Sequence, residues 1–158
     1  MIRKLAFALV MTTAFAGGSA NAAEIRRAPS SGAIAITPSV AVPAGTELIF
    51  LSGALPTIAD KERPGATEEQ TRSVLSKLET ALKAEGLGHG DVVKATVFLV
   101  GDPSRGGEID FSGLNKAWSE VFGTTAQPNK PARSTVKVAG LVLPGALVEI
   151  EFVAAKTR

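Results

Sequence analysis

Two strand-like runs close the chain and limit how its C-terminal end can fold. The runs, residues 132–139 and 146–155, flank the turn signal Leu143-Pro144-Gly145. Successive side chains of a strand point to opposite faces of its sheet, so Glu149 and Glu151 share one face. The apolar residues between and beside them then share the other face. This pattern predicts two strands, the second of which carries two carboxylates on a single face.

An arginine opens the first of these runs. The planar guanidinium of Arg133 can form two parallel hydrogen bonds to a carboxylate. Together with Glu149 on a neighbouring strand, it could hold a small anionic ligand and a water molecule. An ordinary surface pair of arginine and glutamate across two strands fits the same residues, since such pairs are common. The residues alone leave both interpretations open.

Residues 1–22 have the pattern of a secretory signal peptide. Two bases precede the apolar run 5–16, which is too short to span a membrane, and Ala20-Asn21-Ala22 matches the small-x-small cleavage pattern. We expect cleavage after Ala22, which leaves 23–158 as a single domain in the periplasm or secreted. No stable membrane association is expected after cleavage, and an uncleaved anchor is the alternative.

The charge balance argues against nucleic-acid binding. The chain has 17 basic and 15 acidic residues, and the predicted signal peptide holds two of the bases and none of the acids. The remaining domain is therefore formally neutral, without the basic excess of a nucleic-acid-binding domain. Cysteine is absent and there is one histidine, so we expect neither disulfides nor a structural zinc site.

Two helices are predicted from apolar stripes at helical spacing. The first runs from about 67 to 85, with Thr67 as its N-cap and Gln70 completing a capping box. The second begins at the cap Asp110 and continues to about Phe122. Their apolar stripes are Val74, Leu75, Leu78, Ala81 and Leu82 in the first helix, and Phe111, Leu114, Ala117, Trp118, Val121 and Phe122 in the second.

Further strands are predicted at 33–36, 46–52 and 91–100, which makes the element order β-β-α-β-α-β-β. Two helices cannot cover both faces of such a sheet, so we expect an α+β fold with both helices on one face of a mixed sheet. The other face would expose apolar side chains, a usual mark of an interface. The sequence therefore predicts a homo-oligomer.

Three smaller features have ordinary explanations. His89 stands in a Gly-x-Gly context, but a phosphate-binding loop follows a strand and precedes a helix, and here the order is reversed. We interpret His89 as a turn residue. Asn115 lies beside the apolar stripe of the second helix. Ser52-Gly53 ends a strand, where it either makes a turn or lets a ligand approach the backbone closely.

Four segments of the chain resemble the RidA family of imine deaminases, also called the YjgF family. They are LIFLSGALP, TEEQTRSVLSKLETALKAEGLGHGDVVKATVFL, FSGLNKAWSEVFG and PARSTVKVAGLVLPGALVEIEFVAA. The resemblance implies a chorismate-mutase-like α+β subunit, and a homotrimer with the sheets inside and three clefts between subunits. It also implies hydrolysis of 2-imino and 2-enamino acids to 2-oxo acids and ammonia, with no cofactor and no metal.

The resemblance also implies roles for particular residues. Arg133 matches the arginine that binds the substrate carboxylate, and Glu149 matches the glutamate near the attacking water. Ser52, Gly53 and Asn115 match positions that line or support the cleft. A small 2-imino or 2-oxo acid is the expected ligand.

The chain departs from the family pattern at several of these positions. Ser39 stands where a tyrosine enters the cleft, Thr135 replaces a frequent cysteine and Ala54 a frequent glutamine, and the loop 101–108 is longer than usual. Ser39 and Thr135 are still expected beside the substrate. The missing tyrosine motivates an alternative, a non-catalytic trimer that binds a small ligand or acts like a chaperone. RNA cleavage is a weaker alternative, which strong salt-dependent RNA affinity would favour.

Overall fold

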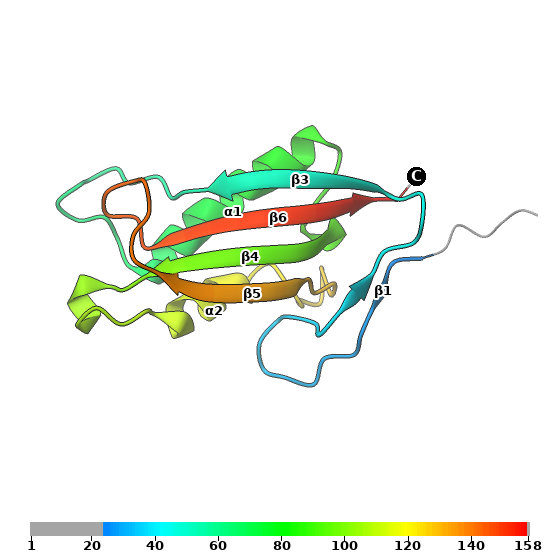
Figure 1. The fold of residues 1–158 in the computed structure, drawn as a ribbon, viewed down its shortest axis with the longest axis horizontal. Helices are drawn as coiled ribbons and strands as arrows, with labels where there is room; N and C mark the ends of the chain where they lie inside the picture. Colours follow the sequence, from blue (N-terminus) through cyan, green and yellow to red (C-terminus); the bar gives the residue numbers. More distant parts are fainter. Residues whose placement is uncertain (1–23, 158) are drawn as a thin grey trace, which may run out of the picture.

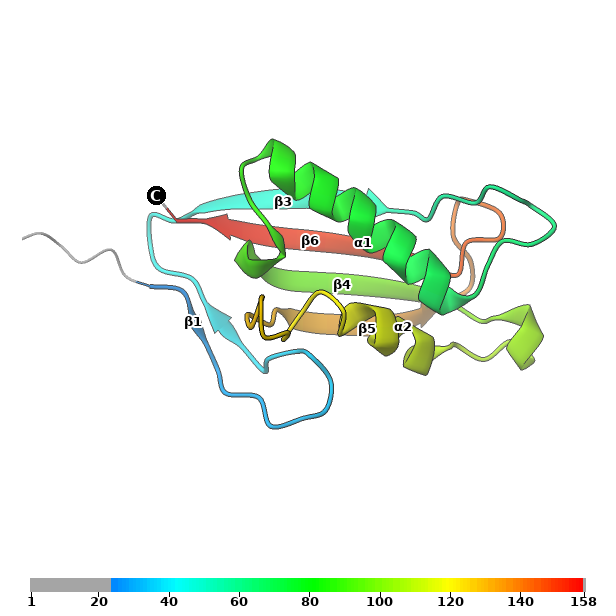
Figure 2. The ribbon, with the colours of Figure 1, turned by 180° about the vertical axis from the view of Figure 1, so that it is seen from behind.

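A four-stranded mixed sheet carries two helices on one of its faces in the computed structural model, which describes residues 24–157 (Figures 1 and 2). The signal peptide predicted for 1–22 lies outside these residues. The elements are β1 (Arg26–Arg27), β2 (Val40–Ala41), β3 (Glu47–Ala54), α1 (Thr67–Ala84), η1 (His89–Asp91), β4 (Val92–Val100), η2 (Pro103–Arg105), α2 (Phe111–Trp118), β5 (Ala132–Val138) and β6 (Val148–Lys156).

The strand order of the sheet is β3-β6-β4-β5. β6 pairs antiparallel with both β3 and β4, whereas β4 and β5 are parallel. Both helices cover the same face, and the opposite face carries neither of them (Figures 1 and 2). The prediction of an α+β fold with two helices on one face of a mixed sheet is confirmed.

The strand predicted at 33–36 is wrong. That segment bends instead, and the short strands β1 and β2 form a separate two-stranded ribbon. The backbone of the segment 33–36 finds hydrogen-bond partners outside any β-sheet. The indole Nε1 of Trp118 donates to the carbonyl of Ala35 at 2.9 Å. The backbone N–H of Thr37 donates to the carbonyl of Pro131 at 3.0 Å. Packing against α2 and β5 therefore replaces strand pairing here.

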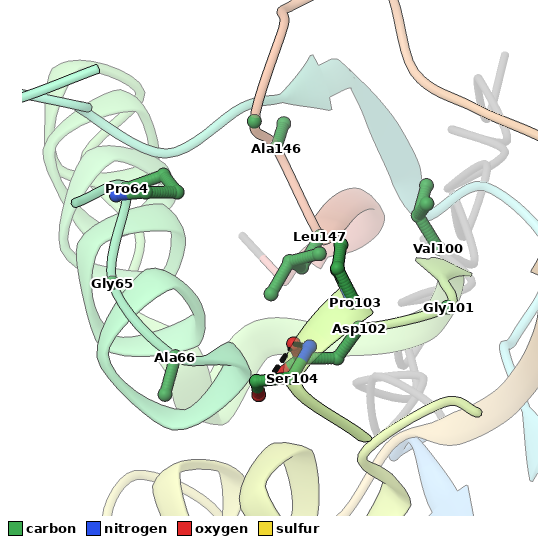
Figure 3. Close-up of a pocket in the computed structure, with 11 residues that line it drawn as sticks. Pro64, Gly65, Ala66, Val100, Gly101, Asp102, Pro103, Ser104, Ala146 and Leu147 are labelled. Atoms are coloured by element: carbon green, nitrogen blue, oxygen red, sulfur yellow. Dashed lines mark hydrogen bonds between the residues drawn. The ribbon is translucent and has the colours of Figure 1, made fainter. Parts of the chain in front are cut away.

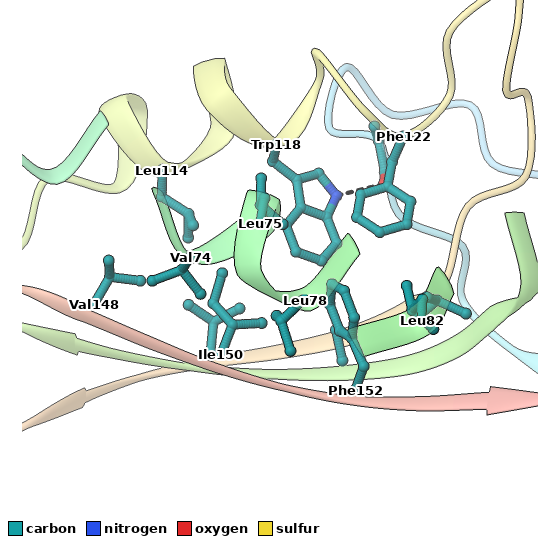
Figure 4. Close-up of a cluster of buried hydrophobic side chains, with 14 of the residues drawn as sticks. Val74, Leu75, Leu78, Leu82, Leu114, Trp118, Phe122, Val148, Ile150 and Phe152 are labelled. Atoms are coloured by element: carbon teal, nitrogen blue, oxygen red, sulfur yellow. Dashed lines mark hydrogen bonds between the residues drawn. The ribbon is translucent and has the colours of Figure 1, made fainter. Parts of the chain in front are cut away.

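The core lies between the helices and the covered face of the sheet (Figure 4). Its fully buried side chains come from α1, α2, β4 and β6, and they include Val74, Leu78, Leu82, Leu114, Trp118, Val148, Ile150 and Phe152. Val92 and Val93 are both buried, although strict alternation would separate them. A shift of register between Val92 and Lys94 explains this, since a bulge lets adjacent residues face the same side.

Helix α1 begins differently from the sequence prediction. Ala66 is the N-cap and Thr67 is the first helical residue, so Gln70 does not complete a capping box. The buried amide of Gln70 instead binds the segment before β6: its Nε2 donates to the carbonyl of Gly145 at 2.9 Å, and its Oε1 accepts from the N–H of Leu147 at 2.8 Å. This side chain ties the start of α1 to the start of β6.

The uncovered face of the sheet exposes large apolar side chains. Phe50 on β3 is 75% exposed and Val136 on β5 is 44% exposed. Apolar side chains gathered on one sheet face fit the expected interface between copies of the chain. The homo-oligomer itself stays a prediction. Among residues 24–157, no helix has the length and apolar character needed to cross a membrane.

Candidate functional site

Arg133 lies on the helix-covered side of the sheet, at its β5 edge. The residue is in register with Ala95, a core residue of β4, and so shares its face. The guanidinium carbon lies 4.6 Å from the ring centre of Trp118 and 5.8 Å from that of Phe111. Its Nη2 donates to Oδ1 of Asn115 at 2.7 Å. Helix α2 thus provides aromatic contacts and a hydrogen bond that hold the guanidinium.

The aromatic contacts of Arg133 were missed at the sequence level, where Trp118 was interpreted as core. Trp118 is fully buried, so that interpretation is confirmed, but its ring also supports the guanidinium. Phe111, Asn115 and Trp118 follow one another at spacings of four and three, which places them on one side of a helix. That spacing was the available signal.

Arg133 has no acidic partner within residues 24–157. Its Nη1 is buried without a hydrogen-bond acceptor, and none of the ion pairs of the described part of the chain includes it. Burial lowers the pKa of Arg133 to about 10, so the guanidinium remains charged at neutral pH. A buried cation with an unused donor is costly unless an anion binds it. The geometry therefore suits a bound carboxylate.

Thr135 and Asn115 accompany Arg133 on this side. Thr135 is in register with the core residue Val97, so it faces the same way as Arg133. We call Arg133, Asn115 and Thr135 the arginine half-site. The segment that carries Ser39 is tied to the start of β5 through the Thr37–Pro131 hydrogen bond, and Ser39 itself is exposed.

Glu149 lies on the opposite face of the sheet. Its neighbours on β6, Val148 and Ile150, are fully buried on the covered face, so its own side chain points away from the helices. Gly53 lies against it, and a Cβ at this position would collide with the Glu149 carboxylate. Ser52 is part of the same irregular stretch of β3, where the register with β6 shifts. We call Ser52, Gly53 and Glu149 the carboxylate half-site.

The expectation that Arg133 and Glu149 lie on neighbouring strands and face one ligand is wrong for a single chain. β4 separates β5 from β6, and the two side chains point to opposite faces. The reason is that the chain does not form a hairpin after β5: β6 crosses over to pair between β3 and β4. One small ligand therefore cannot touch both groups of the same chain.

Burial of an unpaired charge leads to a stability prediction for Arg133→Met. The folded protein holds this cation at a lowered pKa, about 10, so the buried charge destabilises the fold at every pH below that value. Methionine removes the charge, but it also removes the contacts with Trp118 and Asn115. We expect a free energy of unfolding equal to wild type or higher by up to about 1 kcal/mol, measured by urea denaturation followed by circular dichroism.

The pH dependence provides the control. As pH rises through about 10, the wild-type guanidinium loses its proton more readily in the folded than in the unfolded state. The free energy of unfolding of wild type should then rise relative to that of Arg133→Met, so any advantage of the variant at neutral pH should shrink. A variant destabilised by several kcal/mol at pH 7 would show that Arg133 has a structural partner and would contradict this account.

A cavity of about 540 Å³ lies elsewhere, between the start of α1, the loop after β4 and the start of β6 (Figure 3). Its walls are mostly apolar, and its buried carboxylate, Asp102, accepts hydrogen bonds from the N–H and hydroxyl of Ser104 at 2.8 and 2.7 Å. No residue of either half-site lines it. This cavity is therefore separate from the residues expected to bind and hydrolyse the substrate.

His89 packs among aromatic rings rather than in a site. Its ring lies edge-on to Phe122 and Phe152, at centroid distances of 5.4 and 6.3 Å. Burial lowers the pKa of His89, which favours the neutral imidazole. Within the described residues, no group of three or more His, Cys, Asp or Glu side chains could hold a metal ion.

Comparison with known proteins places these features in a family. A family model described as Endoribonuclease L-PSP matches residues 30–156. A RutC family protein from Pyrococcus horikoshii is 35% identical over 120 residues, 75% of this chain and 86% of the relative. Reactive Intermediate Deaminase A, chloroplastic, from Arabidopsis thaliana is 36% identical over 109 residues, 68% of this chain and 52% of the relative.

Solved structures share the fold. A member of the YjgF protein family from Neisseria meningitidis matches with a TM-score of 0.55 at 28% identity, over 85% of this chain and 97% of that chain. E. coli TdcF with bound serine matches with a TM-score of 0.57 at 32% identity, over 83% of this chain and 94% of that chain. The predicted fold and the predicted resemblance are both confirmed by these matches.

Proposed function

The chain belongs to the RidA family, whose model is described as Endoribonuclease L-PSP, and on this premise we propose that it hydrolyses reactive 2-imino and 2-enamino acids to 2-oxo acids and ammonia. The observation that carries the proposal is Arg133, a half-buried cation with an unused buried donor and no carboxylate partner among the described residues. A relative named as a reactive intermediate deaminase and the serine bound to E. coli TdcF support a small amino-acid-like ligand.

The active site lies between two copies of the chain in this proposal. Arg133 and Glu149 point to opposite faces of their own sheet, so a single small substrate can meet both only if they come from different subunits. The arginine half-site of one subunit would face the carboxylate half-site of the next. A closed ring of three subunits, with the exposed faces carrying Phe50 and Val136 turned inward, repeats this contact three times.

The chemistry needs little from the protein beyond positioning. The substrate carboxylate binds the Arg133 guanidinium, whose other nitrogen is held by Asn115. Glu149 of the neighbouring subunit accepts a proton from water as the water oxygen bonds to the imine carbon, and it then passes this proton to the imine nitrogen. The hydroxyl proton of the resulting carbinolamine then moves to its amino group, the carbon–nitrogen bond breaks, and ammonia leaves the 2-oxo acid. Imines are intrinsically reactive, so holding one beside an oriented water supplies most of the acceleration.

The place of action is part of the proposal. The pattern of residues 1–22 suits a cleavable signal peptide, so the domain 23–158 would act in the periplasm or after secretion. Its substrates would then be imines that form outside the cytoplasm. Mass spectrometry of the exported protein would show whether the chain begins at Ala23.

A coupled assay tests the deaminase proposal. An amino-acid oxidase, with catalase to remove peroxide, generates 2-imino acids in the presence of semicarbazide, which traps the imine. We expect the wild-type protein to divert imine from the semicarbazone to free 2-oxo acid. If a folded oligomer accelerates none of the short, branched and aromatic imines, the proposed activity is excluded.

Absence of any acceleration would favour the alternative, a non-catalytic trimer that binds a small ligand. The observation on its side is Ser39, an exposed serine where the family has a tyrosine. A protein without that ring could retain the arginine half-site and lose the closed wall around the imine. Binding of a 2-oxo acid by a protein that releases no ammonia from 2-imino acids would identify this case.

A further inference from the structure

Arg27 shares two unusual properties with Arg133, at a place that the deaminase proposal does not use. Burial lowers the pKa of Arg27, and its Nε is buried without a hydrogen-bond acceptor among the described residues. No ion pair within residues 24–157 includes it. The nearby carboxylate of Asp91 partly offsets the effect of burial and accepts from the N–H of Gly88 at 2.8 Å.

The guanidinium of Arg27 is anchored at one side only. Its Nη2 donates to the carbonyl oxygens of Gly90 at 2.9 Å and Val92 at 3.3 Å, where η1 meets β4. The residue belongs to β1 and is in register with Val40 of β2. The fold thus fixes the position of this cation and leaves part of its hydrogen-bonding capacity unused.

Lys130 lines the same cavity as Arg27. A cavity of about 220 Å³ is lined by Arg27, Lys130, Asn129 and Ser30, and no carboxylate is among its lining residues. The stem of Lys130 lies against Gly123, where a Cβ would be only 2.8 Å from Lys130 Cε. Within the described part of the chain, the ammonium of Lys130 makes neither a hydrogen bond nor an ion pair.

From this arrangement we infer that the cavity between β1 and the segment before β5 binds a small oxyanion, a carboxylate or a phosphate group. A guanidinium and an ammonium supply charge, which is the chemistry that recognises such groups. The guanidinium and the Ser30 hydroxyl supply donors, and the Asn129 Nδ2, which already donates to the Gly90 carbonyl at 3.1 Å, has one N–H left. The site is distinct from the arginine half-site, and it stands whether or not the deaminase proposal holds.

Titration calorimetry with inorganic phosphate and with pyruvate tests the inference. Lys130→Gln removes one cation whose ammonium has no partner in the described residues, so the fold should survive. Lys61→Gln removes the same charge from an exposed loop and is the matched control. For pyruvate, Arg133→Met is combined with each lysine substitution, so that the arginine half-site does not contribute. Circular dichroism confirms that each variant is folded.

We expect at least one of the two anions to bind, at one site per chain. Binding of phosphate alone would identify a phosphate ligand, and binding of pyruvate alone a carboxylate ligand. Lys130→Gln should weaken that binding about tenfold, and Lys61→Gln should leave it unchanged. Arg133→Met should retain phosphate binding if phosphate is the ligand. Absence of binding of both anions, equal affinity in the two lysine variants, or loss of phosphate binding in Arg133→Met would each overturn the inference.

Discussion

Replacing Arg133 by alanine is expected to lower kcat/KM for 2-imino acids about a thousandfold. The substitution removes both charge-assisted hydrogen bonds that a guanidinium offers a carboxylate, each stronger than a neutral hydrogen bond. Arg133→Lys keeps the charge but loses the planar fork, and its ammonium cannot both bind Asn115 and chelate the substrate in the same geometry. We expect the lysine variant to retain at most about a tenth of the wild-type kcat/KM.

The measurement is the oxidase-coupled assay, run with wild type, Arg133→Ala and Arg133→Lys at several substrate concentrations. Gel filtration should show the same oligomer for all three, because the guanidinium has no ion pair in the described chain to lose. Full activity of a folded Arg133→Ala protein would mean that the substrate carboxylate binds elsewhere, and the assigned site would be wrong.

Replacing Glu149 by glutamine is expected to lower kcat about a hundredfold with little change in KM, because a residue that acts on the water contributes to the reaction step rather than to substrate binding. Glutamine has nearly the same shape, so the close contact with Gly53 is preserved. Glu151→Gln is the matched control: it lies two residues away on the same face of β6, in register with Thr96, and is exposed.

The split between KM and kcat separates a catalytic from a structural role. If both parameters worsen together and the oligomer dissociates, Glu149 stabilises the interface and does not act on the water. If Glu151→Gln is as damaging as Glu149→Gln, the face as a whole is sensitive and the assignment of Glu149 fails.

The helices and most strands were predictable from local patterns. The apolar stripe of α1 and the alternation in β4 and β6 are properties of single segments, so they appear in the sequence as periodicities. The segment 33–36 is apolar for another reason. Ala35 is buried against Trp118, 83 residues further along the chain, and Thr37 bonds to the distant Pro131. No local pattern reports such contacts.

The candidate site was only half predictable. Residue types and the family resemblance singled out Arg133 and Glu149, and the alternation in β6 placed Glu149 opposite the core. Strand order decides the rest, and it depends on which segments pair across the whole fold. β6 inserts between β3 and β4, so β4 separates Glu149 from Arg133, and the registers with β4 turn the two side chains to opposite faces. The sequence of one chain does not reveal this arrangement.

Mixed oligomers test most directly the claim that each site takes Arg133 from one subunit and Glu149 from another. Arg133→Ala and Glu149→Gln chains with different affinity tags are coexpressed in equal amounts, and the assembled oligomers are assayed without selecting a composition. Random assembly should restore about a quarter of the wild-type rate, since one site in four would receive both intact groups. A mixture of wild type with the double variant should also give about a quarter of that rate.

If both groups of a site came from one chain, the first mixture would remain as inactive as either variant alone, and the second would retain about half of the wild-type rate. That pair of results would contradict a site shared between subunits, whereas the proposed shared site predicts recovery of about a quarter of the wild-type rate in both mixtures.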